Sequence, residues 1–479
     1  MSAIAHNEPR PRVIRRRTIL SSAALALGAA IACAALADPE LPDLGSPALH
    51  AEARAKSYAI PAAEIIGFDF LLNRIDRSLY GEEYAVTASS IRRNLRGGWV
   101  VDNDPFKVNQ LLHPYQGSIY HGFARSAGLD FWQSFGYTFA GSALWEIAGE
   151  TTPPSRNDQI ASGIAGSFLG EALFRMASLI LEKGNRGDAW RELSAAAISP
   201  STGFNRVAFG ERFSAILNSN DPAYYSRVQV GTSATTQFES GTSTEPQRNE
   251  VTADFAMDYG LPGKPGYRYT RPFDFFNFQV AASSVGGIES LSTHGLLYGT
   301  SYEAGQNYRG IWGLYGSYNY IAPQVFRLSS TALSLGTTGE LKLTDSIAVQ
   351  GTALAGVGYA AVGTLRSTEE RDYHYGVAPQ VLLALRMIFG DQASLDLTAR
   401  DFFVSRVAGT GTGGHDNIAR ADFSLTMRVL REHAIAVKYL WSRRDATFPS
   451  LNDLSQTRGT FGVYYVLLGN ERFGAVNWR

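Results

Sequence analysis

The feature that most constrains this chain is a two-residue alternation of apolar and polar side chains in its second half. One face of each run is apolar or aromatic and the other is polar or charged; the clearest runs are 251–259, 394–400, 420–429, 433–441 and 461–467. Successive side chains of a strand point to opposite faces, so each run predicts a β-strand. Several runs reach about ten residues, the length that a tilted strand needs to cross a bilayer.

The connections between these runs alternate between short and long. Asp345-Ser346, Gly390-Asp391-Gln392 and Arg431-Glu432 predict tight turns, whereas the polar stretches 364–372, 406–416 and 446–456 predict loops. Membrane barrels carry turns at one rim and loops at the other. The pattern therefore predicts an antiparallel transmembrane β-barrel of about 12 strands over residues 223–479. A soluble β-sandwich or a closed soluble barrel is the alternative, but such folds seldom sustain strands this long.

The N-terminus predicts export. Five arginines precede an apolar run over residues 19–36, and Ala35-Leu36-Ala37 has the small-x-small form of a cleavage site. We interpret residues 1–37 as a removable signal peptide; the alternative is a retained membrane anchor. The single cysteine, Cys33, lies in this segment. Its removal would leave a mature chain without disulfides and without cysteine chemistry.

Composition narrows the expected partners and the expected location. Only 18% of the residues are charged and the net charge is −1. Without a basic excess, nucleic acid is not an expected partner. The barrel pattern and the export signal predict the cell outer membrane as the location. The expected partners are outer-membrane lipid and the barrel-assembly machinery, with an unknown small-molecule or lipid ligand.

Between a linker at residues 38–60 and the barrel, residues 61–222 are predicted to form an α-helical domain. Asp104-Pro105 has the form of a helix start, and so does Ser155 with Asp158, which opens a nearly apolar helix to about Leu181. The predicted fold class is therefore α+β, a helical domain followed by a barrel. We expect the helices at the periplasmic rim or partly plugging the lumen, although the pattern alone does not place them inside or outside the barrel.

Ionisable side chains on these apolar helices are the candidates for chemistry, because a buried charge is costly unless it is paired. Glu146 and Glu150 lie one turn apart on one helix face, and Arg125 is an obvious partner for an acid. The candidate catalytic residues are His113, His121, Glu146, Glu150, Asp158 and Glu171. This set suits general acid–base catalysis or a divalent cation such as zinc or iron. No other cofactor is expected.

Each candidate also has a structural interpretation. Asp158 is equally well explained as a residue that begins a helix, and His113-Pro114 as a helix boundary. Glu146 and Glu150 suit a solvated face or partners of arginines. No nucleophile elbow, phosphate-binding loop or zinc-protease motif accompanies them in the sequence.

The stretch that holds these residues resembles a bacterial family known only as domain of unknown function 3943. The resemblance rests on Asn109, His113-Pro114, Gly117, Tyr120, Ala124-Arg125-Ser126, Gly141-Ser142, Trp145-Glu146, Glu150, Pro154-Ser155, Asn157-Asp158, Gly166 and Gly170-Glu171. It implies a Gram-negative envelope protein with a helical segment before a barrel, and it supplies no reaction. A fainter similarity links the polar residues to VanZ-like proteins. The chain departs from that family because the usual Asp-Lys before the histidine is missing and its helices are too polar for four membrane spans.

These observations leave three hypotheses about function. The first is a structural or transport-type outer-membrane barrel with a helical domain. The second is an envelope enzyme whose His/Glu/Asp cluster acts on lipid or cell-wall material. The third is a soluble periplasmic protein, which would be recovered from cells without detergent.

Overall fold

The computed structural model describes residues 56–183, 188–239, 245–364, 371–409, 413–448, 453–470 and 472–478. The predicted signal peptide lies outside the described residues, as does most of the predicted linker. The helices are α2 (Ala59–Tyr80), α3 (Ala88–Arg96), α4 (His113–Ser126), α5 (Phe131–Ala148), α6 (Arg156–Ile160), α7 (Gly166–Glu182), α8 (Ala189–Ile198) and α9 (Pro200–Phe209). Two π-helical segments, η2 (Val108–Leu112) and η3 (Ala161–Ala165), lead into α4 and α7.

The strands follow the helices in the chain. They are β1 (Tyr224–Glu239), β2 (Glu245–Tyr259), β3 (Phe276–Ser283), β4 (Gly287–Ala304), β5 (Tyr308–Ile321), β6 (Phe326–Lys342), β7 (Ile347–Thr364), β8 (Tyr373–Phe389), β9 (Ala393–Ser405), β10 (Ala408–Gly409), β11 (His415–Leu430), β12 (His433–Thr447) and β13 (Leu454–Leu468). Each long strand pairs antiparallel with the long strand next to it in the chain, and β1 also pairs with β13. In the described chain the long strands therefore close into a barrel of twelve, while the two-residue β10 pairs only with β8. The predicted fold class is confirmed.

The outward face of the barrel is largely apolar where no helix covers it, with charged side chains such as Arg443 and Asp445 near the end of β12. On β12, Ile435, Val437 and Tyr439 are exposed, whereas the neighbouring Ala434 and Ala436 are buried. The same alternation exposes Val463 on β13. A band of exposed apolar side chains around a closed barrel is stable in lipid and not in water.

The inward face of the barrel is charged, and ion pairs cross the lumen. They join strands that are not neighbours in the sheet: Arg386 to Asp258 at 2.9 Å, Lys438 to Asp254 at 2.7 Å and Arg227 to Asp396 at 3.2 Å. A cavity of about 100 Å³ remains among these side chains. The lumen of the described barrel is thus occupied by side chains of its own strands.

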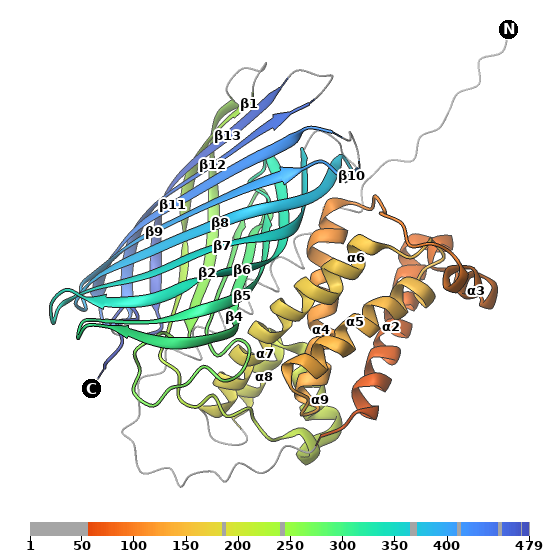
Figure 1. The fold of residues 1–479 in the computed structure, drawn as a ribbon, viewed down its shortest axis with the longest axis horizontal. Coiled ribbons are helices and arrows are strands. Elements are labelled where there is room, and N and C mark those ends of the chain that lie inside the picture. The colour runs from red at the N-terminus through yellow and green to blue at the C-terminus, as the bar shows by residue number, and fades with distance from the viewer. Residues whose placement is uncertain are drawn as a thin grey trace.

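The helices stand beside the barrel wall, as Figure 1 shows. Gly316 on β5 points outward like the exposed Trp312, and a Cβ atom added to Gly316 would lie 2.5 Å from the ring of Phe168 on α7. Trp132 of α5 stacks on Tyr298 of β4 with ring centroids 5.5 Å apart. The described helices therefore cover the outer wall, whereas the sequence led us to expect them at the periplasmic rim or in the lumen.

The two predicted helix starts are confirmed. A helical turn begins at Phe106, directly after Asp104-Pro105. At the second start, the Ser155 side chain accepts a hydrogen bond from the Asp158 backbone. The continuous helix from Arg156 to Glu182 is long and apolar enough to cross a membrane, and 94% of its apolar window is buried. It is buried because it packs between the barrel wall and the other helices.

Helix α2 has the reverse polarity of a helix on a water-soluble protein. Its polar residues Asp69 and Asn73 are buried against the other helices. Its outward face carries large apolar side chains that are 42–61% exposed, together with the exposed Arg74 and Arg77; the apolar ones are Ile66, Phe70, Leu71, Ile75 and Leu79. An apolar stripe normally faces a protein core, whereas this one faces away from the core of the described chain.

Candidate functional site

Three helix ends bring His113, Glu146 and Asp158 together. His113 begins α4 after a π-helical segment, Glu146 lies near the end of α5, and Asp158 lies in the first turn of α6. One nitrogen or carboxylate oxygen from each residue lies within 4.8 Å of those of the other two. The three residues are only 2–6% exposed. We call this group the His113 cluster.

Hydrogen bonds orient each member of the His113 cluster. Ser162 Oγ lies 3.2 Å from His113 Nδ1, so the opposite nitrogen, Nε2, faces Asp158 Oδ2 at 3.9 Å. Asn157 Nδ2 donates to Asp158 Oδ1 at 3.0 Å. The backbone N–H of Ser155 donates to Glu146 Oε2 at 2.8 Å. Each of the three side chains therefore has one polar atom fixed by a hydrogen bond, and its other polar atom faces the other two residues.

Burial and like charges change the protonation of the cluster. Burial, with the charges of neighbouring carboxylates, raises the pKa of Glu146 and of Asp158 well above the usual range. Burial lowers the pKa of His113 to about 4, so its ring is neutral. In the described chain no lysine or arginine forms an ion pair with Glu146 or Asp158. The cluster therefore holds acids without a basic counter-ion.

Two further acids border the cluster. Asp102 Oδ1 accepts hydrogen bonds from Asn109 and Asn157, each at 2.6 Å. Glu150 accepts from Trp145 Nε1 at 2.7 Å and from the Thr152 hydroxyl, and burial raises its pKa to about 7. The predicted candidate Glu150 thus lies beside the cluster and is satisfied by its own partners.

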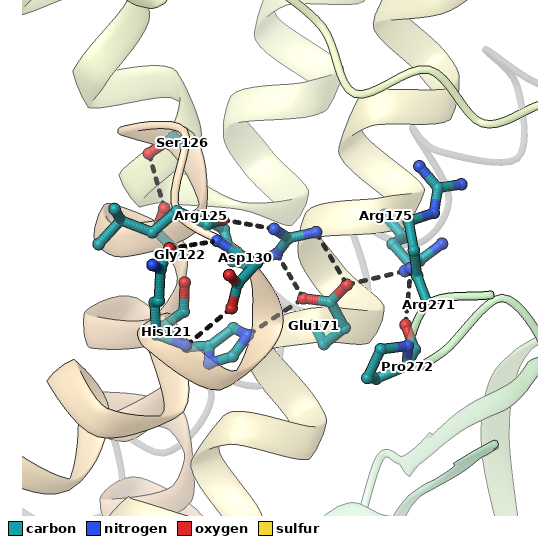
Figure 2. A network of polar contacts seen from close by, with 12 residues as sticks. His121, Gly122, Arg125, Ser126, Asp130, Glu171, Arg175, Arg271 and Pro272 are labelled. Atoms are coloured by element: carbon teal, nitrogen blue, oxygen red, sulfur yellow. Dashed lines mark hydrogen bonds and ion pairs between the residues drawn. The ribbon is translucent and has the colours of Figure 1, made fainter. Parts of the chain in front are cut away.

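The predicted candidates His121 and Glu171 belong to a separate network, shown in Figure 2. Glu171 accepts from Arg125 at 2.7 Å, from His121 at 3.1 Å and from Arg175 at 2.8 Å. Arg175 also donates to Asp274, in the segment between β2 and β3, at 3.0 Å. All five side chains are buried. We call this group the Glu171 network; its geometry ties α4 and α7 to the barrel.

Sequence reasoning missed the residues that connect the cluster to the barrel. Tyr373 and Tyr375 on β8 place their hydroxyls 3.0 Å from Asn109 Nδ2 and 2.8 Å from Asn157 Nδ2. No local signal could have found these tyrosines, because they lie more than 200 residues away in the chain. Asp102 stands in the same polar stretch as the candidates and could have been chosen with them.

The closed barrel, with its apolar outside and charged lumen, defines the protein as an outer-membrane β-barrel protein with a helical domain on its wall. It is located in the outer membrane, which excludes the soluble periplasmic alternative. Residues 98–201 match the model of a family described as "Domain of unknown function (DUF3943)". The matched region contains all six candidate residues and confirms the resemblance seen in the sequence. The similarity to VanZ-like proteins is not borne out, and no curated protein matches the chain.

Solved structures similar to this chain include other outer-membrane proteins. The NanC porin has 6% identity and a TM-score of 0.23 over 49% of this chain and 98% of its own. A mutant of the TodX monoaromatic hydrocarbon channel has 9% identity and a TM-score of 0.22, and the match covers 58% of this chain and 94% of the channel. The translocator domain of the autotransporter NalP from Neisseria meningitidis has 16% identity and a TM-score of 0.22, and the match covers 56% of this chain and 97% of that domain. The outer-membrane assignment rests on the strand pairing and the surface of this chain itself.

Proposed function

We propose that this protein is an outer-membrane enzyme whose His113 cluster hydrolyses an ester bond of an anionic lipid. The observation that carries the proposal is the position of the cluster. It lies beside Tyr373 and Tyr375, which begin β8 directly after the connection at residues 365–372. The longer connections of a membrane barrel usually face the outside of the cell, and three of them, at 365–372, 406–414 and 448–453, share this rim, while the 260–275 connection lies at the other. The cluster is therefore level with the outward-facing leaflet.

The surface of α2 supports a lipid substrate. Its 22 residues correspond to about 33 Å of helix, close to the thickness of a bilayer core at roughly 30 Å. Its exposed apolar side chains resemble those on the outward face of the barrel, while Asp69 and Asn73 are buried. The helical domain would thus lie in the membrane beside the barrel, with its loop-side end at the lipid headgroups.

Helix α3 supports an anionic headgroup. Arg92, Arg93 and Arg96 on this helix are all exposed. The helix is held next to the cluster, since Asn94 Nδ2 donates to the carbonyl oxygen of Glu150 at 3.3 Å. Arginine side chains bind phosphate oxygens through paired hydrogen bonds. A lipid that enters here would bring its charged headgroup toward these arginines.

Hydrolysis at the cluster would add one water across the ester. The water oxygen forms a bond to the acyl carbon or phosphorus, the bond to the leaving oxygen breaks, and the leaving oxygen takes up a proton released by the water. Substrate entry requires displacement of the segment above the cluster, where Val100 is bonded to Pro154 and Arg156 through the backbone. Carboxylates of Glu146 and Asp158 would accept hydrogen bonds from the attacking water.

The proposal can be tested by expressing the chain in a Gram-negative host and analysing the envelope lipids of that host. We expect the wild-type chain to change the lipid profile relative to empty vector, and His113→Ala and Glu146→Gln to reduce the new product by at least about 100-fold. Asp188→Asn, an exposed carboxylate at the start of α8, is the control and should match the wild type. Mass spectrometry of extracted lipids gives the readout, and heat-modifiable gel migration verifies folded barrels. An unchanged product level in folded His113→Ala would refute the assignment.

Spin labels test the position of the helical domain. In a Cys33→Ser background, a nitroxide at Phe70→Cys should be reached by oxygen and shielded from a water-soluble nickel complex, because its surroundings are acyl chains. Val463→Cys on the barrel provides the lipid reference, and Glu303→Cys near the β4–β5 turn provides the water reference. Power-saturation measurements in lipid vesicles compare the three sites. If the nitroxide at residue 70 is as accessible to the nickel complex as the nitroxide at residue 303, α2 does not lie in the membrane.

The barrel itself meets the structural part of the role that the sequence predicted, since it anchors the helical domain in the outer membrane. Among the described residues its lumen holds cavities of about 100 Å³ and about 20 Å³ beside crossing ion pairs. Solute transport along the lumen, the other role expected from the sequence, would require these ion pairs to open.

A further inference from the structure

The free atoms of the His113 cluster converge on one point. Ser162 engages His113 at Nδ1, Asn157 engages Asp158 at Oδ1, and the Ser155 backbone engages Glu146 at one oxygen. Each side chain has a second ligand atom near the shared centre, where Asp158 also forms a side-chain hydrogen bond with Asp102. Hydrogen bonds on the far side of histidine and carboxylate ligands are the usual surroundings of a bound metal ion.

The spacing of these atoms suits a single cation. Ligands at roughly 2.0–2.2 Å from one ion lie at most about 4.4 Å apart. His113 Nε2 and Asp158 Oδ2 are 3.9 Å apart, and all three ligand atoms lie within 4.8 Å of one another. Small side-chain rotations would bring them to coordination distance.

A second, independent observation also points to a bound ligand. Asn109 is completely buried and donates to Asp102 at 2.6 Å, yet its amide oxygen has no partner among the described residues. An unmade hydrogen bond on a buried polar atom costs about 1–3 kcal/mol. An amide oxygen and the nearby Asp102 carboxylate are further oxygen donors for a cation in this acidic centre.

We propose that His113, Glu146 and Asp158 bind one divalent cation of the zinc or iron class. A histidine nitrogen with two carboxylate oxygens favours these ions over calcium or magnesium, which prefer oxygen ligands alone. The inference deepens the proposed function, on whose site it rests. A bound cation would favour the charged carboxylate form of Glu146 and Asp158, which have no lysine or arginine partner among the described residues.

Zinc binding by the full-length chain in detergent tests this site. After treatment with a chelator and dialysis against zinc, we expect one zinc per wild-type chain by elemental analysis, and a higher unfolding temperature than for the stripped protein. Glu146→Gln and Asp158→Asn should weaken zinc binding by at least about 10-fold, and His113→Ala should lose it. Asp188→Asn should bind like the wild type. Equal zinc content in wild type and folded His113→Ala would overturn the proposal.

The failure of this inference is distinguishable from failure of the proposed function. Zinc that binds through His113 without any change in envelope lipids would leave the metal site standing and refute the lipid chemistry. Lipid turnover that needs His113 but persists in chelator-treated, zinc-free protein would refute the metal site and leave the enzyme standing.

Discussion

Replacement of Glu171 by alanine is expected to lower the free energy of unfolding of the helical domain by about 3–5 kcal/mol. The carboxylate lies between Arg125 and Arg175, and both guanidinium groups are buried. Its removal would leave Arg125 without a carboxylate partner and Arg175 with Asp274 alone. Thermal unfolding in detergent, followed by the helical circular dichroism signal, measures the loss.

The matched control for this prediction is Glu192→Ala. Glu192 also pairs with an arginine, Arg206 at 2.6 Å, but its side chain is 38% exposed. Water screens such a pair, so its loss should cost less than about 1 kcal/mol. If Glu171→Ala and Glu192→Ala unfold at the same temperature, the Glu171 network does not hold the helical domain in place.

The second large effect is expected from Gly117→Val on α4. A Cβ atom at Gly117 would lie 1.9 Å from the carbonyl oxygen of Ser162. Helix α4, which holds Gly117, and η3, which holds Ser162, would therefore have to move apart. The expected cost is about 3 kcal/mol, as for an overpacked core. Because Ser162 also orients His113, the substitution should abolish the arrangement of the His113 cluster.

The control for the glycine prediction is Gly67→Ala on α2. No atom lies within 4 Å of a Cβ added at Gly67. Alanine is the better helix former, so this change should stabilise the helix by about 0.5–1 kcal/mol. Helical circular dichroism on heating compares the two variants. Gly117→Val that melts no earlier than the wild type would show that α4 and η3 can separate without loss of stability.

The strands could be predicted from the sequence because alternation records directly which side chains avoid the lumen. The same signal could not place the helical domain. On β2, Val251 is exposed, whereas Phe255, Met257 and Tyr259 on the same face are buried in the core that contains α7. A strand needs an apolar outward face whether that face contacts lipid or a packed helix. The alternation of apolar and polar residues is therefore the same for a lipid-facing strand and a helix-covered strand.

The candidate site was predicted as one group and is found as two. His113 and His121 lie eight residues apart on one buried helix, about 12 Å along its axis. Which acid each histidine meets depends on how α5, α6 and α7 pack against that helix, and helical spacing carries no such information. The sequence therefore identified the ionisable residues but could not divide them between the His113 cluster and the Glu171 network.

The pairing of β1 with β13 has a consequence for biogenesis. These are the first and last strands of the chain, so their pairing is the step that closes the cylinder. Val230 and Val463 on their outward faces are exposed, whereas the helices cover the wall at β4 and β5. The helical domain meets the seam at the start of β1, where Lys183 after α7 lies over the ring of Tyr224. The cylinder can close only when the whole barrel sequence from β1 to β13 is available, because its first and last strands form the seam.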